Sequence, residues 1–293
     1  TIDTSEGNVD VTFDDLKINV SGKTEVDGSG KTEVDGSGKT EGDSSGDGSG
    51  HGGKAAVTVR GNHDATIELD GDNKLKSGSN NAGLEKNERE SKGTLTIKDD
   101  NGKDGSLTAE GGDGGGDGGG AGIGGKHESG AGNIEITGGT IKAVGGEGAA
   151  GIGGGVYGTG HDIEISGGKV SATGGDANKN LDSSRPGAAG IGDGAGTRSE
   201  IDPNAPPSNP SNPNHIIISG DAEVEARAGA STGGKTAAIG GGMVGEISND
   251  ALSSGHNGSL TRYDSAGNKM EDYSYDRRTP SQPEQPDDTE NND

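Results

Sequence analysis

Two stretches of the chain are close copies of each other: Ile134-Glu-Ile-Thr-Gly-Gly-Thr-Ile-Lys-Ala-Val-Gly-Gly146 and Ile163-Glu-Ile-Ser-Gly-Gly-Lys-Val-Ser-Ala-Thr-Gly-Gly175. In each copy, apolar and polar residues alternate on both sides of a Gly pair, which is typical of two short strands joined by a tight turn. Successive side chains point to opposite faces of a strand, so Ile134 and Ile136 share one face and Glu135 takes the other. The repeat therefore predicts half-buried strands in series.

A second motif accompanies these copies. Ala121-Gly-Ile-Gly-Gly125 recurs as Ala150-Gly-Ile-Gly-Gly154 and, with one change, as Ala189-Gly-Ile-Gly-Asp193. It supplies a third short strand to each repeat, and the connecting loops vary in length. Stacked repeats of this kind share a core that no single repeat could bury. We therefore predict an all-β, right-handed parallel β-helix with three short strands per turn and Gly-rich corners. The residues expected to face its interior are Ile123, Ile134, Ile136, Ile141, Ile152, Ile163, Ile165, Val170 and Ile191, with Ile136 stacked directly on Ile165.

The solenoid is expected to span residues 1–259, with two loop insertions. Residues 23–53 contain the octapeptide Lys-Thr-Glu-Val-Asp-Gly-Ser-Gly twice in tandem, and residues 197–214 are rich in Pro. Residues 260–278 alternate around Ala266-Gly-Asn268 and predict a β-hairpin that caps the open end of the stack. The Pro-rich, acidic residues 279–293 are typical of a linker or tail, which favours a multi-domain parent.

The composition limits the classes of partner. The chain has 63 Gly, 2% aromatic residues, no Cys and a net charge of −24. An acidic surface repels nucleic-acid phosphates and anionic membranes, so we expect no nucleic-acid partner. No apolar run approaches the ~20 residues that a membrane-spanning helix needs, so we expect no membrane insertion. A disordered Gly/Asp/Ser chain is the alternative interpretation, but disorder does not require Ile at a fixed distance from Gly pairs.

A few side chains are candidates for binding. Asp113 and Asp117 lie in a Gly-rich stretch where backbone carbonyls are able to join them, so calcium is the expected ion, although no known calcium-loop pattern is matched. His127 and His161 fall in corresponding loops of adjacent repeats and are predicted to approach each other. Tyr157, in a Gly-Val-Tyr-Gly loop, is the one aromatic residue in the middle of the repeats. We predict these three as ligand-binding residues.

No catalytic pattern is present. The His residues show no H-E-x-x-H pairing, and the Arg residues do not repeat beside paired acids as a lyase base would require. The Gly-rich run at 118–125 is not followed by Lys-Ser/Thr, which argues against a phosphate loop. We therefore expect no enzymatic activity.

The segments Ala55-Ala-Val-Thr-Val59 and Ala65-Thr-Ile-Glu-Leu-Asp-Gly-Asp-Asn-Lys-Leu-Lys-Ser-Gly78, with the Gly-Thr-Leu-Thr-Ile and Gly-Ala-Gly-Ile-Gly-Gly blocks, resemble a known family. This family is the carbohydrate-binding-type right-handed β-helix modules of secreted and wall-attached Firmicutes proteins. The resemblance covers about residues 1–250. It implies a fold related in shape to polysaccharide lyases, and some members bind acidic plant polysaccharides or cellulose and carry calcium.

These observations predict an extracellular, monomeric, non-catalytic module of a bacterial cell surface. Its expected ligand is a polysaccharide or a host glycoconjugate, as for an adhesin. The alternative is a structural stalk or spacer in a multi-domain surface protein. A polysaccharide lyase is the third interpretation, and the residues favour it least.

Overall fold

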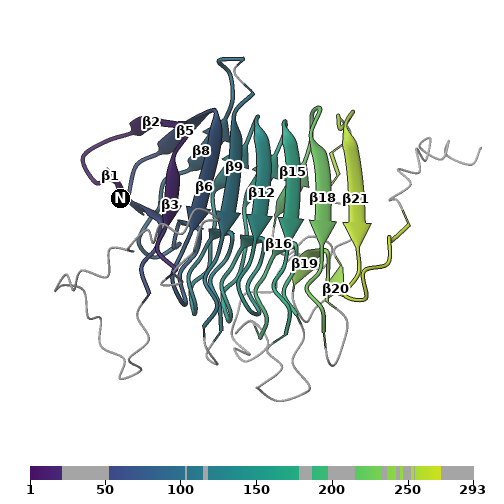
Figure 1. The fold of residues 1–293 in the computed structure, drawn as a ribbon. Helices are drawn as coiled ribbons and strands as arrows, with labels where there is room; N and C mark the ends of the chain where they lie inside the picture. The colour runs from purple at the N-terminus through teal and green to yellow at the C-terminus, as the bar shows by residue number, and fades with distance from the viewer. Residues whose placement is uncertain are drawn as a thin grey trace, which may run out of the picture.

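A computed structural model describes residues 1–21, 53–102, 104–114, 118–177, 187–196, 215–231, 236–241, 245–246, 252–253 and 255–271. Within these residues the chain forms strands and no helix, and the strands stack into three sheets (Figure 1). Each pass of the chain adds one strand to each sheet, except that the last described pass adds none to the second sheet and two to the first; we name such a pass a rung. The protein is therefore an all-β parallel solenoid, as the repeats predict.

The strands of each sheet follow one another along the stacking axis. The first sheet contains β1 (Ile2–Thr4), β4 (Val57–Gly61), β7 (Leu84–Glu85), β10 (Ile123–Gly124), β13 (Ile152–Gly153), β16 (Ile191–Gly192), β19 (Ile239–Gly241) and β20 (Gly245–Glu246). The second contains β2 (Val9–Asp14), β5 (Ala65–Asp70), β8 (Leu95–Lys98), β11 (Ile134–Ile136), β14 (Ile163–Ile165) and β17 (Ile216–Ile218). The third contains β3 (Lys17–Asn19), β6 (Asp72–Lys76), β9 (Ser106–Glu110), β12 (Thr140–Val144), β15 (Lys169–Thr173), β18 (Glu223–Arg227) and β21 (Ser259–Tyr263). All neighbouring strands are parallel except β19 and β20.

The core is a set of apolar ladders that run from rung to rung. Ile136 lies opposite Ile165 in the adjacent strand, which confirms the predicted stacking. All nine residues that the sequence places inside the solenoid are fully buried. The register of the third sheet aligns Ala143 with Ala109 and Ala172, so one of its inward columns is made of methyl groups. Shared ladders of this kind let a chain with few large apolar residues build a continuous core.

The second Gly of each Ala-Gly-Ile-Gly motif is required by its backbone. Gly124, Gly153 and Gly192 have φ of 134°, 136° and 129°, a conformation that residues with a Cβ rarely adopt. A Cβ at Gly153 would also lie 1.9 Å from the carbonyl oxygen of Gly192 in the next rung. The motif repeats because each rung stacks the same tight corner on the previous one.

After the last strand of the third sheet, the described chain makes a tight turn. β21 adds to the third sheet beside β18, and the chain then reverses over residues 264–268. Tyr263 and Lys269 form an antiparallel bridge, and the Asp264 carboxylate accepts hydrogen bonds from the N–H groups of Ala266 and Asn268. The expected boundary between residues 259 and 260 thus falls inside β21. Most of the insertion 23–53, all of 197–214 and the tail 279–293 lie outside the described residues.

Candidate functional site

The outer face of the third sheet carries rows of polar side chains at a regular spacing. The register aligns Lys142 on β12 with Thr108 on β9 and Ser171 on β15. A second row aligns Thr140 with Ser106 and Lys169. Neighbouring strands lie about 4.8 Å apart, so these rows present a donor or acceptor at each such step along the axis. Figure 1 shows this sheet as an uninterrupted row of parallel strands.

Three central strands of this face form what we name the lysine–hydroxyl patch. Its side chains all point outward from the third sheet and are exposed or half-buried: Ser106, Thr108, Thr140, Lys142, Lys169, Ser171 and Thr173. Neither Lys142 nor Lys169 forms an ion pair with a described side chain, although Glu223 lies opposite Lys169 on β18. The patch therefore offers two ammonium groups among hydroxyl groups that both donate and accept hydrogen bonds.

Two ion pairs lie at the borders of the patch, one on each side. Toward the N-terminus, Lys76 lies 3.1 Å from the Glu110 carboxylate. Toward the C-terminus, Arg227 bonds to Glu225 at 2.8 Å. The Arg227 guanidinium also lies 3.6 Å from the centroid of the Tyr263 ring, a cation–π contact. Tyr263 is an aromatic residue on the outer face that the sequence argument assigned to the cap.

The outer face of the second sheet has the opposite character. Its outward charged side chains are Asp10, Asp14, Glu68, Asp70, Glu135 and Glu164, with Lys98 as the single cation among the described strands. Lys98 is engaged by Glu68 at 3.4 Å and Asp100 at 2.8 Å. Glu135 and Glu164 lie directly opposite each other in adjacent strands, in the same register that stacks Ile136 on Ile165. One solenoid therefore presents an acidic face and a face where lysines stand among hydroxyl groups.

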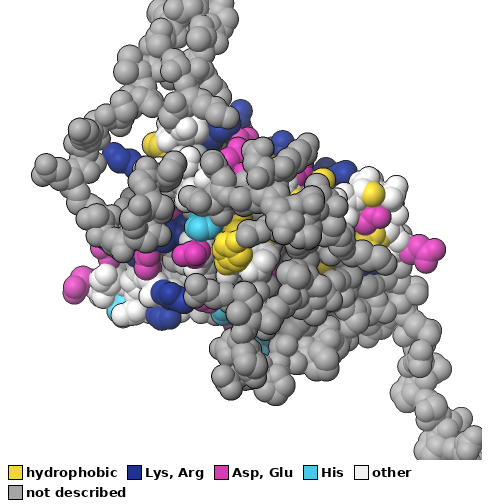
Figure 2. Space-filling model, turned by 90° about the horizontal axis from the view of Figure 1, so that it is seen from below, with side chains coloured by type: hydrophobic (Ala, Val, Ile, Leu, Met, Phe, Trp, Pro, Cys, Tyr) yellow, Lys and Arg dark blue, Asp and Glu magenta, His cyan; other side chains and the backbone are white. Residues whose placement is uncertain are grey.

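The structure brings two of the three predicted ligand-binding residues together. His127 and Tyr157 lie in the loops that follow β10 and β13, and their rings meet edge to face with centroids 5.9 Å apart. Tyr157 has φ of 61°, and a Cβ at Gly196 in the next rung would lie 2.8 Å from its Cε1 atom. Figure 2 views the molecule from the side of these loops and shows hydrophobic and histidine side chains adjacent to one another.

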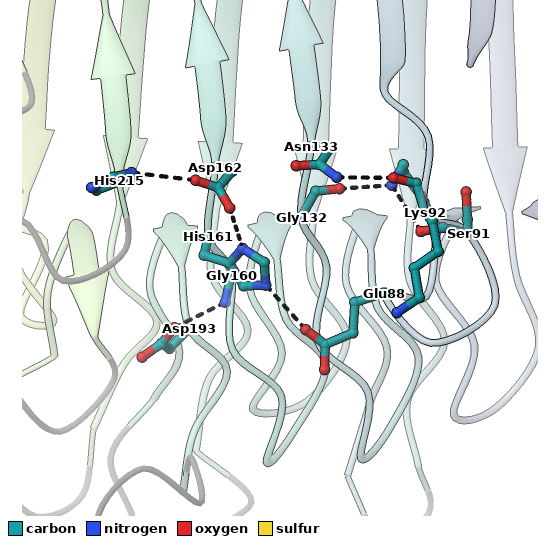
Figure 3. Close-up of polar contacts among 11 residues, drawn as sticks. Glu88, Ser91, Lys92, Gly132, Asn133, Gly160, His161, Asp162, Asp193 and His215 are labelled. Carbon is teal, nitrogen blue, oxygen red and sulfur yellow. Dashed lines mark hydrogen bonds and ion pairs between the residues drawn. The ribbon is translucent and has the colours of Figure 1, made fainter. Parts of the chain in front are cut away.

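His161 occupies the other end of its loop. The loops after β10 and β13 have equal length, and the register places His127 opposite Val156 and His161 opposite Gly132. The His161 ring bonds to carboxylates through both nitrogens: Nε2 lies 3.1 Å from Glu88 and Nδ1 lies 2.7 Å from Asp162 (Figure 3). Hydrogen bonding to Glu88 raises the pKa of His161 to about 9, so the ring is a cation at neutral pH.

The Glu88–His161 pair spans two rungs. Glu88 belongs to the rung of β7 and His161 to the rung of β13, so the pair crosses the intervening rung at Gly132. A Cβ at Gly132 would lie 2.5 Å from the His161 ring. Asp162 continues the chain of contacts to His215 in the following rung, at 3.4 Å. These charged contacts connect side chains from several rungs, so the network has a structural role.

Lys86 is a buried cation that the sequence argument did not single out. It is 1% exposed, and its ammonium group donates to the carbonyl oxygen of Gly132 at 2.7 Å and to that of Ser91 at 3.4 Å. Burial lowers the pKa of Lys86 to about 8. Its position after Leu84 corresponds to Asp193 after Ile191, whose carboxylate accepts the N–H of Gly160. Both side chains satisfy backbone groups at the corner between the first and second sheets.

The structure describes only one of the two residues that the sequence predicts to bind calcium. Asp113 is described, and its carboxylate accepts the backbone N–H of Glu147 in the next rung at 3.1 Å. Burial, with Asp113 nearby, raises the pKa of Glu147. Asp117 lies outside the described residues. Within the part of the chain that the structure describes, no three or more His, Asp or Glu residues are grouped for metal binding, and no helix is suited to crossing a membrane.

Comparisons with protein families, with curated proteins and with solved structures find no match to this chain.

Proposed function

We propose that the chain is a non-catalytic, extracellular module of a bacterial cell surface that binds a polysaccharide or a host glycoconjugate with acidic groups. The proposed binding surface is the lysine–hydroxyl patch on β9, β12 and β15. The observation that carries this proposal is that Lys142 and Lys169 form no ion pair with any described side chain, in a chain with a net charge of −24. A surface that keeps free ammonium groups against such an excess of acid is suited to an anionic ligand.

The chemistry of the patch fits a glycan. Lysine ammonium groups form charge-assisted hydrogen bonds with carboxylates and sulfates. Ser and Thr hydroxyls exchange hydrogen bonds with sugar hydroxyls in either direction. Because the rows repeat with the rungs, a linear polymer is able to meet similar groups at successive positions along the axis. The resemblance to carbohydrate-binding β-helix modules supports the same class of ligand.

The test is retention of the full chain on immobilised polysaccharides of different charge. Polygalacturonate and hyaluronate are the acidic probes, and dextran and cellulose are the neutral ones. We expect retention on the acidic polymers at low salt and its loss as NaCl screens the ammonium groups. Equal retention on neutral and acidic polymers would contradict the role of the lysines.

The stalk or spacer is the second candidate, and a specific observation favours it. The contacts of His161 join rungs by charge without presenting a free group, as suits a rod that must resist bending or pulling. If no polysaccharide or host glycoprotein binds at high micromolar concentration, the spacer interpretation replaces the binding module.

A further inference from the structure

One line of outward positions on the third sheet carries an ordered pattern of charge. The register aligns Lys17 on β3 with Lys74 on β6, Lys74 with Thr108 on β9, and Thr108 with Lys142 on β12. The three lysines are exposed and Thr108 is half-buried. Figure 1 shows these four strands side by side. We name this line of positions the central column, and it runs along the solenoid axis, across the strands.

Lys74 and Lys142 lie two rungs apart in the central column. Strands within a sheet are about 4.8 Å apart, so the two lysines extend from backbone positions about 10 Å apart. The strand between them, β9, has Ser106, Thr108 and Glu110 as its outward residues and carries no cation on this face. The column therefore presents a cation, a hydroxyl group and a second cation at successive rungs.

The rung between the two lysines offers no net positive charge to an anion. Glu110 is the one charged side chain on the outer face of β9, and it forms an ion pair with Lys76 on the previous strand at 3.1 Å. Glu110 and Thr108 are two positions apart on one strand, which separates their backbones by about 7 Å. An anionic group is therefore attracted to Lys74 and to Lys142 and gains no such attraction over Thr108.

Lys74 is available to a ligand although it contacts an acid. Its ammonium group lies 3.5 Å from the Oδ2 atom of Asp72, and both side chains are more than half exposed. Exposed ion pairs of this kind contribute little to stability, so a ligand anion is able to compete for the ammonium group. The other oxygen of Asp72, Oδ1, accepts a hydrogen bond from the Ser106 hydroxyl at 2.9 Å, and this bond does not involve Lys74.

We propose that the ligand of this face is a linear glycan that carries an anionic group on every second sugar and lies along the solenoid axis across β6, β9 and β12. This inference rests on the proposed function and adds the direction of the glycan and the spacing of its charges. One sugar of an extended glycan is about as long as one rung, so anions on alternate sugars reach Lys74 and Lys142 together. The neutral sugar between them lies over Thr108, whose hydroxyl both donates and accepts hydrogen bonds.

A glycan with an anion on every sugar fits the same face less well. Its middle anion lies over Thr108, where no free cation receives it and Glu110 is the nearest outward charge on the strand. Each additional anion also meets the repulsive field of a chain with a net charge of −24. The glycan with fewer charges should therefore bind more tightly. The opposite order is expected if each anion binds any lysine of the face equally well.

The test compares two oligosaccharides of equal length by isothermal titration calorimetry of the full chain at low salt. A hyaluronate hexasaccharide carries carboxylates on alternate sugars, and hexagalacturonate carries one on every sugar. We expect the hyaluronate hexasaccharide to bind at least about threefold more tightly, because specificity is the difference between the two affinities. Lys74→Gln and Lys142→Gln should each weaken its binding about tenfold, the expected loss of one charge-assisted hydrogen bond.

Lys17→Gln is the matched control for the two lysine variants. It removes the same charge from the same column, one rung outside the pair, and should leave the affinity for the hyaluronate hexasaccharide within about twofold of the parent chain. Circular dichroism shows that each variant is folded. Weakening by Lys17→Gln equal to that by Lys74→Gln would overturn the proposed spacing.

A gain of binding gives a second readout. Thr108→Lys supplies a cation at the middle rung and should raise the affinity for hexagalacturonate about tenfold while that for the hyaluronate hexasaccharide stays within about twofold. Thr66→Lys adds the same charge to the outer face of the second sheet and should leave the ratio of the two affinities unchanged.

The outcomes separate this inference from the proposed function. If both oligosaccharides bind and hexagalacturonate binds at least as tightly as hyaluronate, the alternate spacing is overturned while binding of acidic glycans stands. An equal change in both affinities on Thr108→Lys would overturn the spacing in the same way. If neither acidic oligosaccharide binds at high micromolar concentration, the proposed function fails and this inference fails with it.

Discussion

The outer faces of the second and third sheets rest on the same core and differ in nearly every other respect. On the second sheet, Glu135 and Glu164 repeat one charge in adjacent rungs, and Lys98, the single outward cation of its described strands, forms ion pairs with Glu68 and Asp100. On the third sheet, Lys142 and Lys169 lie among hydroxyl groups and form no ion pair with a described side chain. The inward residues of both sheets are constrained by packing, whereas the outward residues are free to differ. In this solenoid the fold is specified by the inward columns, and the distinction between the faces lies in the outward ones.

The largest loss of stability should come from a charged residue placed in the core that both sheets share. Ile165→Asp places an unpaired charge opposite Ile136 and should lower the free energy of unfolding by several kcal/mol. Glu164→Asp, one residue earlier on the same strand but outward, should change it by less than about 0.5 kcal/mol. Urea denaturation followed by circular dichroism measures both. Equal stability of Ile165→Asp and the parent chain would refute the register.

A smaller loss of stability is expected from replacing His161, which lies just before the second sheet. His161→Gln removes a cation bonded to Glu88 and Asp162, and should cost on the order of 1 kcal/mol because the groups are only half-buried. The pKa of His161 is raised from 6.5 to about 9, so its contribution is complete below pH 6.5 and is lost as pH rises through 9.

The measurement is the difference in unfolding free energy between the parent and His161→Gln across this pH range. Using the difference removes the contribution of Lys86, which titrates nearby in both proteins. A difference that stays constant from pH 6 to pH 10 would show that the ring is not a stabilising cation.

Calcium should distinguish specific binding by acidic loops from general screening. Millimolar Ca²⁺ is expected to raise the melting temperature by a few degrees, more than Mg²⁺ or Na⁺ at matched ionic strength, if the loop of Asp113 and Asp117 supplies oxygen ligands. Differential scanning calorimetry gives the comparison, with Asp113→Asn as the control. Equal shifts with all three ions would leave screening of the acidic surface as the whole effect.

The smallest expected change in stability comes from neutralising one acidic residue on each face. Glu164→Gln relieves repulsion with Glu135 and should stabilise the protein by a few tenths of a kcal/mol. Glu225→Gln on the third sheet removes the partner of Arg227 and should not stabilise it. Thermal unfolding at low ionic strength detects both changes. If Glu164→Gln lowers the melting temperature, stacked acids do not repel across these rungs.

Much of the fold follows from local pattern. The alternation of Ile134 to Ile136 and the Gly pairs define which residues face inward, and because the rungs repeat, the same pattern gives the register. The lysine–hydroxyl patch lies at outward positions of that register, but the sequence analysis did not single it out and named Tyr157, His127 and His161 instead. Contacts between rungs at the loops were not predictable in the same way. His161 meets Glu88 across 73 residues and an intervening rung, and this depends on how loops fold back and on the absence of a side chain at Gly132. Aligned loops predicted a pair between His127 and His161, whereas the contact observed is between His127 and Tyr157.

The central claim is that the third sheet, and not the second, binds an acidic glycan. Lys142→Glu and Lys98→Glu change the net charge equally, one on each face. Comparing the two variants therefore separates the effect of the position of the charge from the effect of net charge. The measurement is the affinity of each variant for polygalacturonate at low salt. Lys142→Glu should weaken binding about tenfold, the expected loss of one charge-assisted hydrogen bond, while Lys98→Glu should stay within about twofold of the parent chain. Equal weakening by both variants, or no weakening by Lys142→Glu, would contradict the assignment of binding to this face.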